Sequence, residues 1–289
     1  MQANQDQGMG WVETQIVVGS PAARDLGPRT APLAIPLARP LVVYVLTAIN
    51  VLVWLLTTFY AVFNYKTPLG TAAMGDGLGL EVALRRFGGM DSSLIAEGQW
   101  WRIFTVMFLH AGIIHLGFNS WALIVLGGEA ESLFGRWKFL LYYLLSGLGG
   151  SIASLLINRP ELSVGASGAI FGAIGLLAGY YWRHRNDLGA AGRSRFFNII
   201  LVIVLNMALS TSVARIDNWA HTGGLIGGLL LGLLLAPAYV VRQEVEAEGR
   251  GEREAVVRSQ PGLQLATLAS FALLLIALFA FALSRLPSS

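Results

Sequence analysis

The chain has 289 residues, of which 55% are apolar and only 13% are charged, and its formal net charge is +3. A soluble domain usually carries about a quarter charged residues, so this composition indicates a polytopic membrane protein instead. The basic residues lie in short loops between apolar runs, which is how membrane proteins set their orientation, so no nucleic-acid partner is expected. The absence of cysteine excludes disulfides, thiolate metal sites and a cysteine nucleophile.

The N-terminal stretch 1–40 contains several prolines and no long apolar run. It lacks the apolar core and the small-residue cleavage site of a signal peptide. We therefore expect a disordered N-terminal tail on the cytoplasmic side of the membrane.

Seven apolar segments follow, each judged against the roughly 20 residues that cross a hydrocarbon core of about 30 Å. They are placed at 41–63, 103–127, 137–157, 167–182, 196–213, 218–240 and 263–284. The predicted fold class is an all-α polytopic membrane protein with a membrane core over 41–240. A charged cytoplasmic linker is expected over 241–262, and a seventh membrane helix with a short tail over 263–289. Most Lys and Arg residues fall on one side if the N-terminus is cytoplasmic.

The long loop at about 64–102 joins the first two predicted spans. Its apolar positions Leu80, Ala83, Leu84 and Phe87 share one helical face, which predicts a short helix lying in the membrane interface. Glu81 and Arg85 form an i,i+4 pair on its other face. The neighbouring Trp100 and Trp101 are typical of a headgroup-level anchor.

A few polar residues interrupt the apolar spans, and the predicted topology places them at a similar depth. Ser167 begins the fourth predicted helix, and His221 lies one turn into the sixth. His110, His115 and Asn119 lie in the outer half to middle of the second. Because polar side chains within a membrane are usually functional, we expect these residues to form one site.

Glycines explain how Ser167 and His221 could meet. The fourth helix carries Gly168, Gly172, Gly175 and Gly179, and the sixth carries Gly223, Gly224, Gly227, Gly228 and Gly232. Such stripes permit direct contact between helix backbones. A glycine zipper with incidental polar residues is the alternative for each motif taken alone.

Serine and histidine in hydrogen-bond reach form a pair in which the imidazole activates the hydroxyl as a nucleophile. A third, carboxylate member would orient the imidazole, but Asp217, one turn before His221, is interpreted as an interfacial loop residue. We therefore predict a Ser–His dyad, with Phe171 as a packing surface for the imidazole.

An oxyanion could be stabilised by the backbone N–H of Ser167 at its helix N-terminus, with His115 and Asn119 as further donors. His110 is assigned to the water supply or to a loop contact. A metal site built from His110, His115 and His221 is the alternative, but the chain lacks cysteine and a His-Glu-x-x-His motif, so no metal and no cofactor are predicted. His184, between two arginines, is expected at the surface.

These motifs resemble those of the rhomboid family of intramembrane serine proteases. The matching segments are Trp101-Arg102, His110 with His115 to Asn119, Gly165-Ala166-Ser167-Gly168, and Ala220-His221-Thr222-Gly223. The similarity runs from about 41 to 240, and the helix at 263–284 resembles the extra C-terminal helix of the subgroup with six helices plus one. One position departs from the family pattern, because Arg215 stands where a glycine is common.

The resemblance implies a six-helix bundle plus one helix, with a Ser167–His221 dyad and an oxyanion hole of Ser167, His115 and Asn119. Gly165 and Gly168 would support the nucleophile. It implies cleavage of single-pass transmembrane proteins near the outer face of the bilayer. We expect a multi-pass protein of a bacterial inner membrane, with an organelle or plasma membrane as the alternatives. Helix five and the following loop would gate the substrate. The alternatives are an inactive relative that binds membrane clients, and a transporter or channel. The oligomeric state is left open.

Overall fold

The computed structural model describes residues 39–157, 160–186, 188–212, 216–243, 253–258 and 261–286. Residues 1–38 of the expected N-terminal tail and Arg215 lie outside these ranges. The helices are α1 (Val42–Tyr65), α2 (Leu69–Met74), α3 (Leu78–Arg86), α4 (Ser92–Ala96), α5 (Arg102–Thr105), η2 (Val106–Phe108), α6 (Ile113–Ala122), η3 (Leu123–Gly127), α7 (Gly128–Phe134), α8 (Arg136–Ile157), α9 (Ser167–Arg183), α10 (Gly189–Ser212), α11 (Asn218–Leu235) and α12 (Pro261–Ser284).

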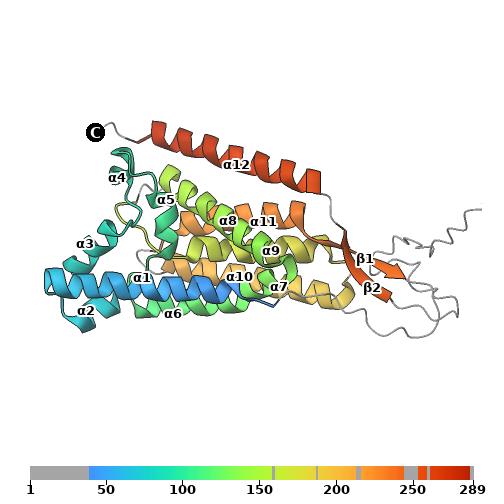
Figure 1. Ribbon diagram of the computed structural model, residues 1–289, viewed down its shortest axis with the longest axis horizontal. Coiled ribbons are helices and arrows are strands. Elements are labelled where there is room, and N and C mark those ends of the chain that lie inside the picture. The colour runs from blue at the N-terminus through green and yellow to red at the C-terminus, as the bar shows by residue number, and fades with distance from the viewer. Residues whose placement is uncertain are drawn as a thin grey trace, which may run out of the picture.

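The long helices lie side by side along the long axis of the molecule, with the short helices α2–α5 at one end (Figure 1). In the described chain, six helical segments are at least 18 residues long and apolar enough to cross a bilayer. The expected fourth span, α9, has 17 residues and is about 26 Å long at 1.5 Å per residue. The prediction of an all-α polytopic membrane protein is confirmed.

The predicted limits of the second span were wrong at both ends. The stretch expected as a single helix over 103–127 is split, because α5 and η2 end before an extended link that reaches Gly112. The spanning helix begins at Ile113 and continues through one π-helical stretch to Phe134. This shift removes His110 from the helix and places it in the link.

A glutamate of α7 binds the backbone at the start of α1. Glu131 is completely buried, and its two carboxylate oxygens accept hydrogen bonds from the backbone N–H groups of Leu41, Val42 and Val43 at 2.6–2.9 Å. These N–H groups have no partner within α1, because the first turn of a helix leaves its donors unpaired. A carboxylate there satisfies them and complements the positive end of the helix dipole.

Helix α9 is the centre of the bundle. Every residue from Gly168 to Tyr181 is buried, so this helix touches neighbours on all sides. Its glycines pack backbone to backbone against α11: a Cβ atom at Gly224 would lie 1.9 Å from the Gly168 carbonyl oxygen, and one at Gly228 would lie 1.9 Å from that of Gly172. Only glycine permits this approach, so the two stripes fix how closely α9 and α11 pack.

Helix α11 ends at Leu235 rather than at the expected residue 240. Ala236 precedes Pro237 and takes an extended conformation, as a residue before proline favours. Two antiparallel strands follow, with Ala238 opposite Arg258. Strand β1 (Ala238–Gln243) covers the end of the expected sixth span and the start of the expected charged linker, and β2 (Arg253–Arg258) lies within that linker. Helix α12 then returns along the bundle beside α8 (Figure 1).

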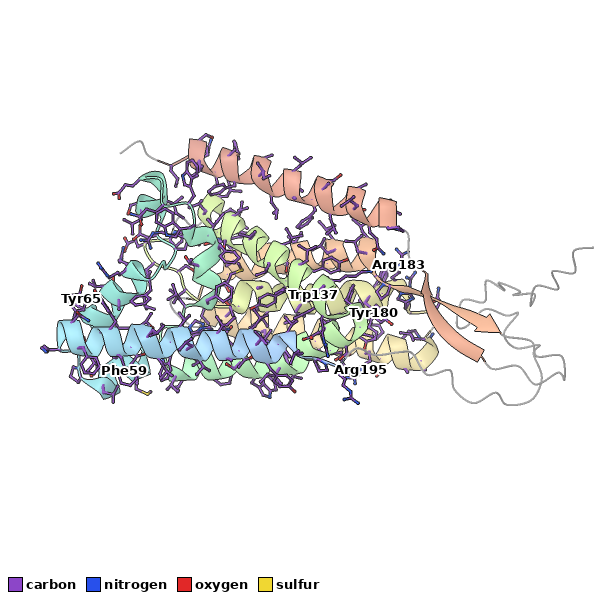
Figure 2. All side chains as sticks on the ribbon, viewed as in Figure 1. Phe59, Tyr65, Trp137, Tyr180, Arg183 and Arg195 are labelled. Carbon is purple, nitrogen blue, oxygen red and sulfur yellow. The ribbon has the colours of Figure 1, made fainter. Side chains whose placement is uncertain are left out.

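The two ends of the bundle differ in their side chains. Arg183 and Arg195 lie near the end that carries the strands, whereas Tyr65 lies at the opposite end, beside the short helices (Figure 2). The side of the membrane that each end faces stays a prediction.

Candidate active site

Ser167 is the first residue of α9, and the segment before it forces a close approach to α6. Gly165 has a φ of +137°, and a Cβ atom there would lie 2.9 Å from Nε2 of His115 and 3.6 Å from Oγ of Ser167. Glycine is therefore required at this position for both its conformation and its lack of a side chain. The Gly165 N–H donates to the carbonyl oxygen of Val106 at 3.1 Å, which fixes the segment.

His221 stands on the first turn of α11 and faces Ser167. A distance of 2.8 Å joins Ser167 Oγ and His221 Nε2, which is hydrogen-bond contact. The imidazole is stacked on Phe171, with ring centroids 4.3 Å apart and planes inclined by 16°. His221 is buried, and its Nδ1 has no hydrogen-bond partner among the described residues, so aromatic stacking rather than a carboxylate orients the ring.

The packing of α9 on α11 brings these two side chains together. Gly168, next to the serine, faces the carbonyl oxygen of Ala220, next to the histidine. Gly224, one turn after His221, lies against the backbone of Gly168. The geometry of the pair therefore follows from the glycine stripes, as their position beside Ser167 and His221 predicts.

The two expected oxyanion donors on α6 differ in their position. His115 lies close to the nucleophile, since a Cβ atom added to Gly165 would lie 2.9 Å from its Nε2 and 3.6 Å from Ser167 Oγ. Asn119 is buried one turn further along, where its Nδ2 donates to the backbone carbonyl oxygen of His115 at 2.9 Å. One amide proton of Asn119 is thus engaged within its own helix.

The remaining histidines have different surroundings. His110 is completely buried beside His115, with ring centroids 5.2 Å apart, and neither of its ring nitrogens has a hydrogen-bond partner among the described residues. Within the described chain, no three His, Asp or Glu side chains gather as metal ligands would. His184 is half-buried near Tyr180 at the far end of α9, instead of being an exposed surface group.

Asp217 has a structural role beyond that of the expected interfacial loop residue. It is the N-cap of α11, and its carboxylate accepts hydrogen bonds from Ala220 N–H, from Ser154 Oγ and from Ser163 Oγ. An Asp directly before an apolar helix is a recognised start signal, which would have identified this role. The part played by the two serines depends on tertiary contacts that the sequence pattern does not contain.

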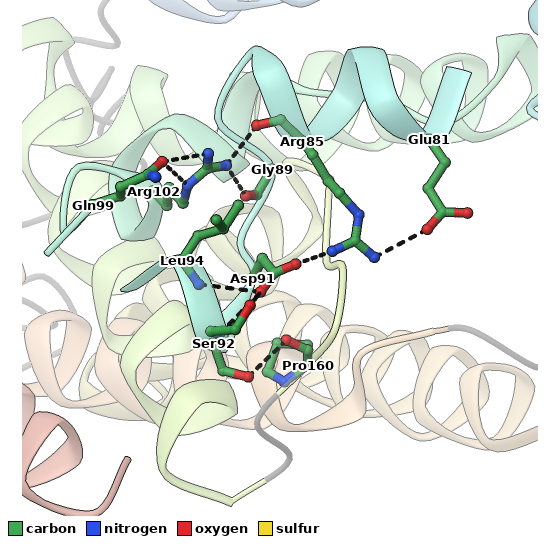
Figure 3. A network of polar contacts seen from close by, with 10 residues as sticks. Glu81, Arg85, Gly89, Asp91, Ser92, Leu94, Gln99, Arg102 and Pro160 are labelled. Carbon is green, nitrogen blue, oxygen red and sulfur yellow. Dashed lines mark hydrogen bonds and ion pairs between the residues drawn. The ribbon is translucent and has the colours of Figure 1, made fainter. Parts of the chain in front are cut away.

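The long loop is joined to the segment that leads to Ser167. Met90 and Ser163 exchange backbone hydrogen bonds of 2.9 and 2.8 Å, and Ser92 donates to the carbonyl oxygen of Pro160 through both its N–H and its hydroxyl. Figure 3 shows this contact together with the polar network around it. The loop therefore supports the nucleophile segment from one side.

Arg102 is the centre of the same network. This side chain, expected beside a headgroup-level anchor, is buried, and it donates to the carbonyl oxygens of Arg85 and Gly89 and to Gln99 Oε1 (Figure 3). Arg85 in turn pairs with Glu81 at 3.0 Å and with Asp91. The predicted helix is confirmed as α3, with Leu80, Ala83 and Leu84 buried. Phe87, expected on the same apolar face, lies just after α3 and is exposed.

Comparison with known proteins assigns the chain to a family. Residues 97–238 match the model of the Rhomboid domain. The chain is 43% identical over 162 residues to rhomboid protease GluP of Bacillus subtilis, covering 53% of this chain and 30% of that protein. It is 37% identical over 164 residues to RHOMBOID-like protein 1 of Arabidopsis thaliana, covering 55% and 41%.

A shorter relative is matched over most of its length. The chain is 37% identical over 141 residues to the putative rhomboid protease YdcA of Bacillus subtilis, covering 48% of this chain and 69% of that protein. The matched region of the family model contains His110, His115, Asn119, Ser167 and His221. The chain belongs to the rhomboid family.

Proposed function

We propose that this protein is an intramembrane serine endopeptidase that cleaves transmembrane segments of other membrane proteins through a Ser167–His221 dyad. The observation that carries the proposal is the 2.8 Å contact between Ser167 Oγ and His221 Nε2, inside a bundle of apolar helices. The family supports it, since GluP is a rhomboid protease by name.

The first step is nucleophilic attack. With its proton on Nδ1, His221 accepts the hydroxyl proton of Ser167 at Nε2 while Oγ bonds to the scissile carbonyl carbon. The resulting imidazolium gives that proton to the leaving nitrogen, and the C–N bond breaks to leave an ester on Ser167. Water then attacks the ester, with His221 first accepting its proton and then returning it to Oγ. Phe171 keeps the imidazole plane fixed through both steps.

The carbonyl oxygen becomes negatively charged in each tetrahedral intermediate and needs donors. The N–H groups of the first turn of α9, including that of Ser167, lack intrahelical partners and lie at the positive end of the helix dipole. His115, whose ring lies across Gly165 on the side where Ser167 Oγ also lies, is the side-chain donor best placed to add to them. Asn119 can contribute its second amide proton, since the His115 carbonyl oxygen engages only one of the two.

The substrate is proposed to be a single-pass transmembrane protein that approaches within the bilayer. A shallow, wide-open apolar groove lies on α6, lined by Ile114, Gly117, Phe118 and Trp121. Ile114 and Phe118 directly precede His115 and Asn119, so the groove adjoins the helix face that carries the proposed oxyanion donors. A helix must unwind locally to expose a scissile carbonyl, so small and helix-breaking residues are expected at the cut.

The proposed orientation rests on the basic residues. Arg183 and Arg195 lie at the end of the bundle opposite the short helices (Figure 2), which supports an orientation with that end in the cytoplasm and the reactive pair nearer the outer face. Cleavage would then occur near the outer face of a bacterial inner membrane, with the N-terminus in the cytoplasm.

The proposal is tested by cleavage of a model single-pass substrate in liposomes, with the products identified by mass spectrometry. Wild type should yield two fragments, whereas Ser167→Ala and His221→Ala should yield none. His184→Ala is the matched control, because this histidine lies at the other end of α9, and it should cleave like wild type. Cleavage by Ser167→Ala at the wild-type rate would overturn the proposal.

A further inference from the structure

The helix that carries His221 starts on Asp217. The carboxylate Oδ1 of Asp217 accepts a hydrogen bond from Ala220 N–H at 3.1 Å, and its backbone carbonyl oxygen accepts one from His221 N–H at 3.2 Å. A side-chain oxygen in this position satisfies a donor that the first turn of a helix leaves unpaired. The backbone position of His221 is thus set directly by Asp217.

The other carboxylate oxygen holds two different parts of the chain. Oδ2 of Asp217 accepts hydrogen bonds from Ser163 Oγ at 2.9 Å and from Ser154 Oγ at 2.5 Å. Ser163 lies four residues before Ser167 in the segment that leads into α9, and Ser154 is a completely buried residue of α8. One side chain therefore joins the segment of the nucleophile, the helix of the base and a third helix.

A carboxylate suits this position better than other side chains do. It accepts hydrogen bonds at both oxygens and has no donor of its own, so it can take one N–H and two hydroxyl groups at once. Asparagine keeps the shape but replaces one acceptor by an NH₂ group, so either both serine hydroxyls must turn to accept from it or it faces the Ala220 N–H, donor against donor. Alanine removes all three contacts.

Asp217 does not form a triad with His221. Both of its oxygens are occupied by the three donors above, and Nδ1 of His221 has no partner among the described residues. Apart from the through-space effect of its charge on the nearby imidazole, its effect on the reaction must therefore pass through the positions of the backbone segments that it joins.

We propose that Asp217 is a positioning residue, whose carboxylate joins the Ser163 segment, α8 and the first turn of α11 and thereby sets the distance between Ser167 and His221. The inference rests on the proposed function for its activity readouts. A misplacement of about 1 Å can lower a reaction rate about 100-fold, so the junction need not touch the substrate to matter.

The test compares Asp217→Ala, Asp217→Asn and the milder Ser163→Ala and Ser154→Ala in the full chain. The control is Ser151→Ala, because Ser151 is also a buried serine of α8 but donates only to Gly147 of its own helix. Each variant is assayed for the rate at which a fluorophosphonate labels Ser167, for kcat and KM on the membrane substrate, and for the pH dependence of kcat. Hydrogen exchange is followed in segments 160–170 and 216–224.

Asp217→Ala is expected to lower kcat and the labelling rate about 10- to 100-fold with little change in KM. Ser163→Ala and Ser154→Ala should each lower them less, and their effects should not add to that of Asp217→Ala, because all three act through one junction. Exchange should rise in both segments, the pH profile should keep its shape, and Ser151→Ala should behave like wild type.

Wild-type labelling rates in a folded Asp217→Ala protein would overturn the inference, as would unchanged rates in both Ser163→Ala and Ser154→Ala. A shifted pH profile with unchanged maximal kcat and unchanged hydrogen exchange in Asp217→Asn would also overturn it, since Asp217 would then act on His221 through its charge alone. If Asp217→Ala does not fold, the two serine variants decide. If the wild type itself is neither labelled nor active, the proposed function fails. Hydrogen exchange in Ser163→Ala still tests the junction in that case. Faster exchange in both segments supports the junction, and unchanged exchange refutes it.

Discussion

A methyl group at Gly224 is expected to disable the site through spacing alone. The added Cβ atom would lie 1.9 Å from the carbonyl oxygen of Gly168 and 2.8 Å from its carbonyl carbon. An ordinary contact is about 3.4 Å, so α9 and α11 must separate or slide by about 1.5 Å, the difference between 3.4 and 1.9 Å. Both groups belong to helix backbone, so no side chain can rotate away to relieve the overlap.

A shift of that size is larger than the tolerance of the reactive pair. The 2.8 Å contact between Ser167 Oγ and His221 Nε2 ceases to be a good hydrogen bond beyond about 3.2 Å. We therefore expect Gly224→Ala to lower the rate of fluorophosphonate labelling and of substrate cleavage by about 100-fold or more. Overpacking should also lower the free energy of unfolding by about 1–3 kcal/mol.

The matched control is Gly149→Ala on α8, which also faces α11. Its Cβ atom would meet the carbonyl oxygen of Gly223 at 3.6 Å, which is ordinary contact, so this variant should keep wild-type activity. Thermal unfolding in detergent shows whether each variant is folded. A folded Gly224→Ala protein that is labelled as fast as wild type would refute the claim that glycine spacing sets the dyad.

Gly165→Ala puts a side chain on a residue with a φ of +137° and against the His115 ring, so it should abolish labelling of the folded protein. Retained labelling would contradict the backbone conformation described for Gly165. Phe171→Ala removes the stacked ring and should lower kcat about tenfold with little change in KM, whereas an unchanged kcat would mean that His221 is oriented otherwise. Glu131→Gln places an amide donor against the N–H groups that begin α1, so it should lower the free energy of unfolding by about 1–3 kcal/mol, which thermal unfolding can check. The labelling rate per folded molecule, measured by titration with the probe, should not change.

Much of the architecture could be predicted from hydropathy, because a membrane imposes helices of nearly fixed length on apolar sequence. The limits of α8 and α9 follow the apolar runs closely. The second span was misplaced because residues 103–112 are as apolar as a membrane helix, although they form α5, η2 and an extended link. Hydropathy does not distinguish an apolar segment packed among helices from one that crosses the bilayer.

The candidate site was predictable to the extent that it is local in sequence. Ser167 and His221 were identifiable because each stands beside glycines in an otherwise apolar helix. The contacts that position them were not identifiable, since Asp217 joins Ser154 and Ser163 across 63 and 54 residues of chain. Glu131 was missed for the same reason, because its three donors lie about 90 residues away on α1. Such long-range polar contacts leave no periodic pattern.

The most direct measurement is to treat the purified full-length protein with a fluorophosphonate and to locate the adduct by peptide mass spectrometry. A single adduct on Ser167 that is absent from His221→Ala is the predicted result, since Oγ becomes nucleophilic only when Nε2 takes its proton. An unlabelled wild-type protein, an adduct on another serine, or labelling of Ser167 in His221→Ala at the wild-type rate would contradict the dyad.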